Sequence, residues 1–329
     1  MYAFKTSPSL MLHALTCGVM MTLGLQAWSQ SYPNKPVRVI SEYVAGNGGD
    51  VFSRQILSSI SAQLGQTMVV ENKGGSGGLV AVEAARRAPA DGYTLLLASQ
   101  NVPVTRRFLS KSEPIDPLVD LTPLSALWRT SLVIAVNPAF APKTLKELVD
   151  YAKTHSGQLS YSTTGIGTQG HFAGANFANI TNTQLLHVPY NDNRLITDVI
   201  SGELPMTIGI ISMVAPHVRA GRLRLVASAG QKRSEMFPDV PTVSELMPNF
   251  EPPPTWTALF APPGLPRPVL DRLAQSIGKA LASPELKAKA ASDGFDLIGN
   301  SPDEFVFQIK KDIEIAGRLV KTAKIEPTD

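Results

Sequence analysis

The stretch that decides the fold is Val37-Arg38-Val39-Ile40, followed by Tyr43-Val44-Ala45-Gly46-Asn47-Gly48-Gly49-Asp50. Its first part predicts a strand, and the glycine-rich turn predicts the start of a helix over residues 51–64. A second such turn, after an expected strand at residues 159–161, is Ser162-Thr163-Thr164-Gly165-Ile166-Gly167-Thr168-Gln169-Gly170-His171. A helix N-terminus exposes unpaired N–H groups and the positive end of the helix dipole, so it attracts anions. Two such turns, far apart in sequence, could face each other across a cleft and hold a carboxylate.

Strands and helices alternate along the rest of the chain. The order strand–helix–strand–helix–strand over residues 37–98 predicts a parallel sheet covered by helices, and residues 159–227 repeat this architecture. We expect further strands at residues 68–71, 93–98, 132–136, 185–188, 206–211, 223–227 and 256–260, and further helices at residues 79–87, 169–178, 196–200, 213–220, 268–281, 284–293 and 302–321.

The chain is long for a single hydrophobic core, because cores tend to split above ~250–300 residues. We therefore expect an α/β protein of two lobes, each a mostly parallel sheet flanked by helices. Lobe 1 comprises residues 30–136 plus 253–329, and lobe 2 comprises residues 137–252. Two crossing segments form a hinge that can close over a ligand. Trp128 and Trp256, near these crossings, are expected in the core, with one of them an alternative lining residue of the cleft.

Residues 1–29 have the pattern of a secretory signal peptide. Lys5 precedes a mostly apolar stretch over residues 10–25, and Ala27-Trp28-Ser29 fits a cleavage site before Gln30. A membrane anchor and a lipoprotein attached through Cys17 are the alternatives, although the apolar stretch is short for a span of about 20 residues. Since Cys17 is the chain's single cysteine, the mature protein would have no disulfide. We expect export to a bacterial periplasm.

Composition and motifs argue against several other classes of protein. The net charge is only +3 and the basic pairs are scattered, which disfavours nucleic-acid binding. The histidines lack a paired metal-ligand spacing, so we expect neither a metal nor a cofactor. Gly46 and Gly48 lack the third glycine of a dinucleotide fingerprint. Residues 74–78 match the nucleophile elbow of a hydrolase, with Ser76 at its centre, but a run of small residues matches that pattern easily. No catalytic residue is assigned.

Short motifs follow one another in a specific order across almost the whole mature chain. They are Tyr32-Pro33-Asn34-Lys35-Pro36-Val37-Arg38-Val39-Ile40, Val69-Val70-Glu71-Asn72-Lys73-Gly74-Gly75-Ser76-Gly77-Gly78, Ala90-Asp91-Gly92-Tyr93-Thr94-Leu95, His187-Val188-Pro189-Tyr190, Pro216-His217-Val218-Arg219-Ala220-Gly221, Arg233 with Pro238-Asp239-Val240-Pro241-Thr242, and Ala261-Pro262-Pro263-Gly264. The ordered set resembles the substrate-binding proteins of tripartite tricarboxylate transporters, the Bug or TctC family.

The resemblance implies a two-lobed, type II-like periplasmic binding fold with a carboxylate held between the lobes. Carried onto matching positions, the ligand-binding residues of the first turn are Ala45, Gly46, Asn47, Gly48 and Asp50. Those of the second turn are Thr164, Gly165, Gly167, Thr168 and His171, and Asp198 matches an acidic residue on the next helix. For His171 the alternative is that only its backbone N–H matters.

The chain departs from the family pattern in ways that concern the ligand. Asn47 brings an amide into the first turn, and Arg194 follows an unusual segment after Tyr190. Near the end of the strand at residues 206–211 the family often has an acidic residue, where this chain has Gly209 and Ile210. An ammonium-bearing ligand would need that acid. We therefore expect an amine-free di- or tricarboxylate, with an aromatic dicarboxylate among the candidates, whose second carboxylate pairs with Arg194.

The predicted function is that of an extracytoplasmic solute-binding receptor. By resemblance, its partners are a small organic carboxylate and a two-component membrane permease, and we expect a monomer. The alternatives are a periplasmic sensor that presents its ligand to a membrane kinase and a secreted hydrolase.

Overall fold

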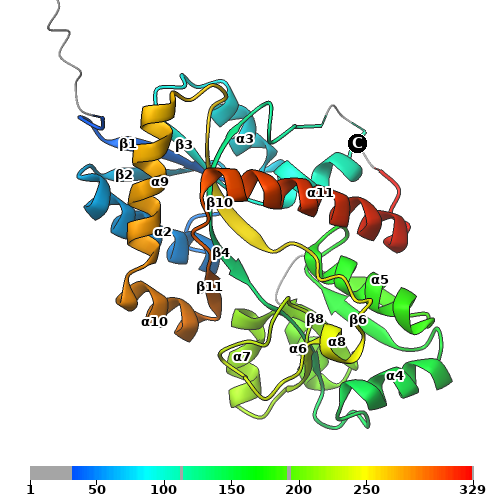
Figure 1. Ribbon diagram of the computed structural model, residues 1–329. Coiled ribbons are helices and arrows are strands. Elements are labelled where there is room, and N and C mark those ends of the chain that lie inside the picture. The colour runs from blue at the N-terminus through cyan, green and yellow to red at the C-terminus, as the bar shows by residue number, and fades with distance from the viewer. Residues whose placement is uncertain (1–31, 112–113, 191–193, 328–329) are drawn as a thin grey trace, which may run out of the picture. The chain divides into compact units, whose positions relative to one another are not determined.

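The computed structural model describes residues 32–111, 114–190 and 194–327, so the expected signal peptide at residues 1–29 lies outside the described residues. The chain divides after Asn34, and Lys35–Asp329 forms one compact unit with two separate sheets. Each sheet is flanked by helices, as expected for a two-lobed α/β protein (Figure 1).

The first sheet has six strands in the order β11-β4-β10-β3-β1-β2. Its strands are β1 (Val37–Ser41), β2 (Met68–Asn72), β3 (Thr94–Ser99), β4 (Thr122–Thr130), β10 (Trp256–Ala261) and β11 (Phe295–Leu297). The helices that go with it are α2 (Gly48–Leu64), α3 (Leu79–Arg86), α9 (Arg267–Leu281), α10 (Pro284–Asp293) and α11 (Pro302–Ala323), with the short turns η1 (Ser76–Gly78), η2 (Asn101–Thr105) and η3 (Arg106–Phe108). Helices α2 and α9 pack side by side (Figure 1).

The second sheet has five strands in the order β7-β6-β8-β5-β9. Its strands are β5 (Leu132–Val136), β6 (Ser160–Thr163), β7 (Leu186–Pro189), β8 (Met206–Ile210) and β9 (Arg224–Ser228). Its helices are α4 (Leu145–Thr154), α5 (Gln169–Thr181), α6 (Arg194–Ser201), α7 (Ile211–Arg219) and α8 (Val243–Leu246).

Both sheets are mixed, although most of their strands share one direction. Strand β1 pairs in parallel with β2 and β3, and β6 pairs in parallel with β7 and β8, as the alternating pattern predicted. The strands that arrive from the other sheet, β5 and β10, pair antiparallel with their neighbours. Such a strand enters the sheet without the helical crossover that a parallel connection needs.

One expected boundary needs correction. Residues 132–136 were expected in lobe 1, but β5 pairs with β8 and β9 of the second sheet. The chain leaves the first sheet at the end of β4 and starts β5 after the single residue Ser131. The first crossing is therefore very short.

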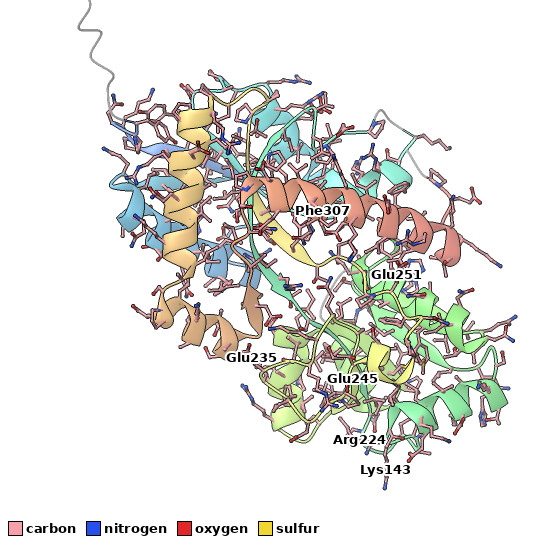
Figure 2. All side chains as sticks on the ribbon, in the orientation of Figure 1. Lys143, Arg224, Glu235, Glu245, Glu251 and Phe307 are labelled. Atoms are coloured by element: carbon pink, nitrogen blue, oxygen red, sulfur yellow. The ribbon has the colours of Figure 1, made fainter. Side chains whose placement is uncertain are left out.

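Helix α11 buries one face against the first sheet, and its C-terminal part packs on α5, a helix of the second sheet. Phe305 and Ile309 are fully buried in the core of the first sheet, whereas Phe307 is exposed on the opposite face of the helix (Figure 2). Further along α11, Ile315, Leu319 and Val320 pack against Phe172 of α5. The Arg318 guanidinium also donates to Glu251, from Nε to Oε2 at 3.0 Å. Helix α11 thus contacts elements that belong to both sheets.

Candidate ligand-binding site

The first turn is built by the N-terminal cap of α2. The Asn47 side-chain oxygen accepts a hydrogen bond from the Asp50 N–H at 2.8 Å and so caps the start of the helix. Among the described residues, none accepts a hydrogen bond from the N–H of Gly48 or Gly49. A β-carbon on Gly49 would lie 2.9 Å from the Tyr43 ring, so the close packing of Tyr43 on the helix start requires glycine there.

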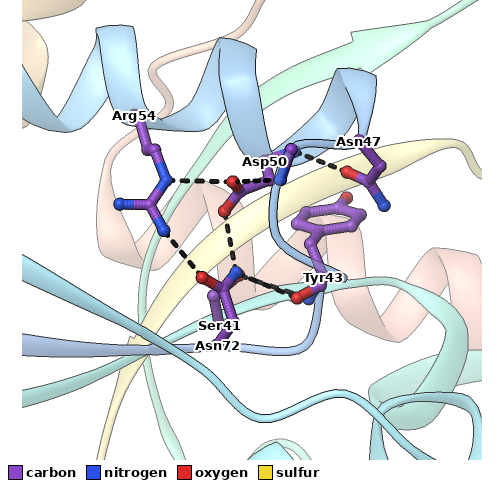
Figure 3. Close-up of polar contacts among 7 residues, drawn as sticks. Ser41, Tyr43, Asn47, Asp50, Arg54 and Asn72 are labelled. Carbon is purple, nitrogen blue, oxygen red and sulfur yellow. Dashed lines mark hydrogen bonds and ion pairs between the residues drawn. The ribbon is translucent and has the colours of Figure 1, made fainter.

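Asp50 supports this turn from beneath instead of facing a ligand. Its carboxylate is 2% exposed and accepts hydrogen bonds from Gly46 N (2.9 Å), Arg54 Nε (2.9 Å) and Asn72 Nδ2 (2.8 Å) (Figure 3). Burial raises the pKa of Asp50, but these bonds outweigh it and hold the pKa below its usual value. The Gly46 N–H is thereby occupied, whereas the N–H groups of Gly48 and Gly49 at the start of α2 have no acceptor among the described residues.

The second turn leads into α5 and is stabilised from within. The Thr168 hydroxyl donates to the Gly165 carbonyl at 2.8 Å, so it does not cap the helix. The Gly167 N–H donates to His171 Nδ1 at 3.1 Å. Gly167 has φ +74°, a backbone conformation that favours glycine, and a β-carbon on it would also have to displace Leu109 Cδ1, which would lie 2.7 Å away.

His171 acts on this turn through its ring. Because Nδ1 accepts from Gly167, the imidazole is neutral with its proton on Nε2. The ring stacks on His187 with 4.0 Å between the centroids, and His187 Nε2 lies 2.7 Å from the Thr163 hydroxyl. Burial lowers the pKa of His171; burial and the neighbouring His171 lower that of His187 to about 4. The pair therefore stays uncharged at neutral pH and holds the turn in place.

A cavity of about 360 Å³ opens in front of the first turn. We call it the main cavity. Both sheets and both crossings contribute to its lining, which consists of Tyr43, Asn47, Gly48, Gly49, Ser99, Trp128, Thr130, Leu132, Gln169, Ile210, Ser212, Met213, Thr255, Trp256, Thr257 and Phe295. Trp128, Tyr43 and Phe295 pack on one another and form an aromatic wall. Among the described lining residues, none carries a charged side chain.

A second cavity of about 360 Å³ adjoins the main cavity, with which it shares Ser99 and Gln169. We call it the polar cavity. It lies at the second turn and is lined by Ser99, Asn101, Arg106, Leu109, Ser110, Ile166, Gly167, Thr168 and Gln169. Together the two cavities connect the N-terminal ends of α2 and α5.

A buried carboxyl group lies behind the shared wall of the cavities. Glu42, at the end of β1, accepts a hydrogen bond from the Ser99 N–H at 2.8 Å. Its other oxygen is buried and has no partner among the described residues. Burial raises the pKa of Glu42 to about 7, against the lowering effect of the Ser99 bond.

The predicted site residues fall into three groups. Asn47 and Gly48 line the main cavity, and Gly167 and Thr168 line the polar cavity. Asp50 and His171 stabilise the two turns. Outside both linings are Ala45, Gly46, Thr164, Gly165, Arg194 and Asp198.

Arg194 and Asp198 interact with a neighbouring tyrosine instead of a cavity. The Arg194 guanidinium lies 5.9 Å from the centroid of the Tyr190 ring, and the Tyr190 hydroxyl donates to Asp198 at 2.5 Å. The expected pairing of Arg194 with a second carboxylate in the cleft therefore finds no support in either lining.

Several lining residues were missed by the sequence reasoning. Ser99 ends β3, and Asn101 and Arg106 follow that strand; ligands of α/β proteins bind at the carboxyl ends of such strands. That rule could have identified them. Trp128 and Trp256 both line the main cavity, where only one was considered, because both crossings border it.

The described residues offer neither a metal site nor a membrane span. No group of three or more histidine, cysteine or acidic residues in the described part of the chain could hold a metal ion. None of the described helices is long and apolar enough to cross a bilayer.

Comparisons with known proteins show a consistent family and fold. The model of the tripartite tricarboxylate transporter family receptor matches residues 52–325. A UPF0065 protein of Bordetella bronchiseptica is 31% identical over 95% of this chain and 93% of its own length. Protein BugT of Bordetella pertussis is 31% identical over 84% of this chain and 85% of its own length. The structure of R. palustris Rpa4515 with adipate is 26% identical and has a TM-score of 0.78, covering 90% of this chain and 100% of that one.

These findings confirm the predicted resemblance and the predicted periplasmic-binding-protein fold. They also confirm that the protein is a periplasmic binding protein of a receptor family and not an enzyme. The chain belongs to the receptor family of the tripartite tricarboxylate transporters.

Proposed function

We propose that this receptor binds an amine-free organic dicarboxylate or tricarboxylate in the main cavity and delivers it to a two-component membrane permease. The observation that carries the proposal is the start of α2, where the N–H groups of Gly48 and Gly49 have no acceptor among the described residues and border an apolar cavity. Hydrogen bonds from N–H groups to a carboxylate are charge-assisted, and the helix dipole adds to them.

The residues that line the main cavity argue against a ligand that carries an amine. Ile210 borders the cavity near the end of β8, and no acidic side chain lies among the described lining residues. An ammonium group buried there would lack a counter-charge, which is costly. The aromatic wall of Trp128, Tyr43 and Phe295 instead suits an apolar ligand body.

Delivery, export and assembly complete the proposal. Residues 1–29 direct secretion and are removed before Gln30. The receptor then acts as a monomer that closes about its two crossings over the ligand, and its relatives' family role in transport favours a permease as partner.

Ligand binding is tested first by thermal shift of the mature protein, from Gln30 onward. The panel contains amine-free mono-, di- and tricarboxylates, aliphatic and aromatic, with amino acids and sugars as controls. A ligand at a hundred times its Kd stabilises the fold by about 2.7 kcal/mol, which raises Tm measurably. A response limited to sugars or amino acids would contradict the proposal.

The role of the Gly48 N–H can be isolated with a matched pair of variants. Proline is tolerated at the first helical position, and Asn47 before it is extended (φ −72°, ψ 165°), so Gly48→Pro removes the N–H without a backbone conflict. Gly48→Ala keeps the N–H, and its β-carbon meets no atom within 4 Å. We expect Gly48→Pro to lower the affinity for the best carboxylate of the panel roughly tenfold or more. Gly48→Ala should lower that affinity much less. Equal affinities of the two variants would show that this N–H does not bind the ligand.

A further inference from the structure

Arg106 is the charged residue among the nine described residues that line the polar cavity. The other eight are neutral, and the described residues place no carboxylate within 4 Å of the Arg106 guanidinium. Many other arginines of the chain do have such a partner, such as Arg54 with Asp50 and Arg318 with Glu251. Among the described residues, therefore, the polar cavity offers this cation no counter-charge.

The position of Arg106 is set by the glycine-rich residues 74–78, which the receptor function had left unexplained. Arg106 Nη1 donates to the Ser76 carbonyl at 3.2 Å, and Asn101 Nδ2 donates to the Gly77 carbonyl at 2.7 Å. The loop adopts left-handed backbone conformations at Ser76 (φ +46°) and Gly77 (φ +64°). Its carbonyls thus support two side chains that line the polar cavity.

A guanidinium has five N–H donors, and the recorded bond to Ser76 uses one of its nitrogens. The remaining donors suit the two-pronged recognition of a carboxylate. The second turn contributes neutral donors only: the Gly167 N–H is bonded to His171, while no described residue accepts a hydrogen bond from the N–H groups of Gln169 and Gly170 at the start of α5. Among the described residues that line the polar cavity, Arg106 adds the full positive charge that these N–H groups lack.

We propose that Arg106 binds the second carboxylate of the ligand, while the start of α2 binds the first. This rests on the proposed receptor function. The two cavities adjoin at Ser99 and Gln169, so one ligand can occupy both. Arg106 is then the residue that selects dicarboxylates over monocarboxylates, the role that the sequence had suggested for Arg194.

The test is calorimetric titration of the mature protein with pairs of acids of equal carbon number, such as adipate with hexanoate and glutarate with pentanoate. The variants are Arg106→Gln and, as a matched control, the adjacent Arg107→Gln, since Arg107 lines neither cavity. We expect Arg106→Gln to lower the affinity for the best dicarboxylate roughly 10- to 100-fold. Its monocarboxylate affinity should stay within a factor of about three, and Arg107→Gln should resemble the wild type.

Other outcomes separate the two proposals. If Arg106→Gln binds the dicarboxylate as tightly as the wild type does, the proposed role of Arg106 is overturned and the receptor function still stands. If Arg106→Gln lowers the affinity for the dicarboxylate and for its matched monocarboxylate equally, Arg106 binds the first carboxylate, which also overturns the assignment. Failure of the wild type to bind any acid would overturn the receptor proposal itself. If Arg106→Gln does not fold, Arg106→Lys keeps the charge without the planar fork, and a selective loss for the dicarboxylate is again expected.

Discussion

Replacing Asp50 tests whether the first turn is held by a buried carboxylate. In Asp50→Ala, three donors lose their acceptor: Gly46 N–H, Arg54 Nε and Asn72 Nδ2. Asp50→Asn keeps the shape but removes the charge, and its amide nitrogen would face one of these donors. We expect the stability order wild type, Asp50→Asn, Asp50→Ala.

The magnitude follows from the burial of each partner. A hydrogen bond to a charged group contributes about 1.5–3 kcal/mol, and such contributions do not simply add. The Arg54 side chain is 44% exposed, so its ion pair is screened and contributes less than about 1 kcal/mol. The bonds from Gly46 and Asn72 then dominate, and Asp50→Ala should lower the free energy of unfolding by about 2–4 kcal/mol. This loss should reduce Tm by at least about 4 °C.

The assay is urea unfolding followed by circular dichroism, with adipate titration of the folded variants. Asp271→Ala is a matched control, because Asp271 also pairs with an arginine four residues away but is 55% exposed. Its cost should stay below about 1 kcal/mol. The advantage of the wild type over Asp50→Asn is present above pH 3.8 and shrinks as the pH falls below that value, because the folded-state pKa of Asp50 is depressed. The reasoning is refuted if Asp50→Ala is as stable as the wild type. An unchanged stability with lost binding would instead show that Asp50 contacts the ligand.

Substitutions at three further positions test other parts of the site. The pKa of Glu42 is raised from 4.5 to about 7, so its contribution to stability is present below pH 4.5 and is lost as the pH rises through 7. Relative to Glu42→Gln, the wild type should therefore lose up to about 3 kcal/mol between pH 5 and pH 8, and a difference independent of pH in urea unfolding would contradict this. His171→Phe keeps a ring against His187 but leaves Gly167 N–H without its acceptor, which should cost about 1 kcal/mol of stability and weaken adipate binding. Unchanged affinity in calorimetry would show that the turn does not depend on this bond. Ile210→Asp places a carboxylate in the main cavity and should weaken adipate at least roughly tenfold, whereas the neutral Ile210→Asn should weaken it less. Equal effects of the two Ile210 variants would mean that charge is not what the cavity excludes.

Local signals predicted much of the fold. Residues 37–98 alternate between strand and helix, and β1, β2 and β3 pair in parallel as expected. The helix expected at residues 302–321 is α11, and it starts at a capping box formed by Ser301 and Glu304. Strand β4 was not predicted, because Pro123 and its mostly buried, non-alternating residues resemble no simple strand pattern. It exists through its pairing with β10 and β11, which are distant in sequence.

In the candidate site too, residues in a local sequence pattern could be predicted, and residues placed by contacts distant in sequence could not. Asn47 and Gly48 were predicted because a turn before a helix is visible in the sequence, and the structure places both at the main cavity. Asp50 was assigned to the ligand, although its neighbours Arg54 and Asn72 occupy it; no local pattern reveals the bond to Asn72 across 22 residues. Arg106 was missed because it reaches the polar cavity through the carbonyl of Ser76, 30 residues earlier.

The lining of the main cavity connects ligand binding with the crossings between the sheets. Thr130 and Leu132 flank the one-residue link at Ser131, and Thr255 ends the return crossing just before β10. The Thr130 N–H donates to the Thr255 carbonyl at 3.4 Å, so the two crossings are joined to each other. A bound ligand therefore touches the segments that any closing motion must bend. The contact of α11 with Phe172 limits that motion, because breaking it would expose Ile315 and Leu319 to water. We therefore expect closure to be a rotation that keeps α11 packed on α5.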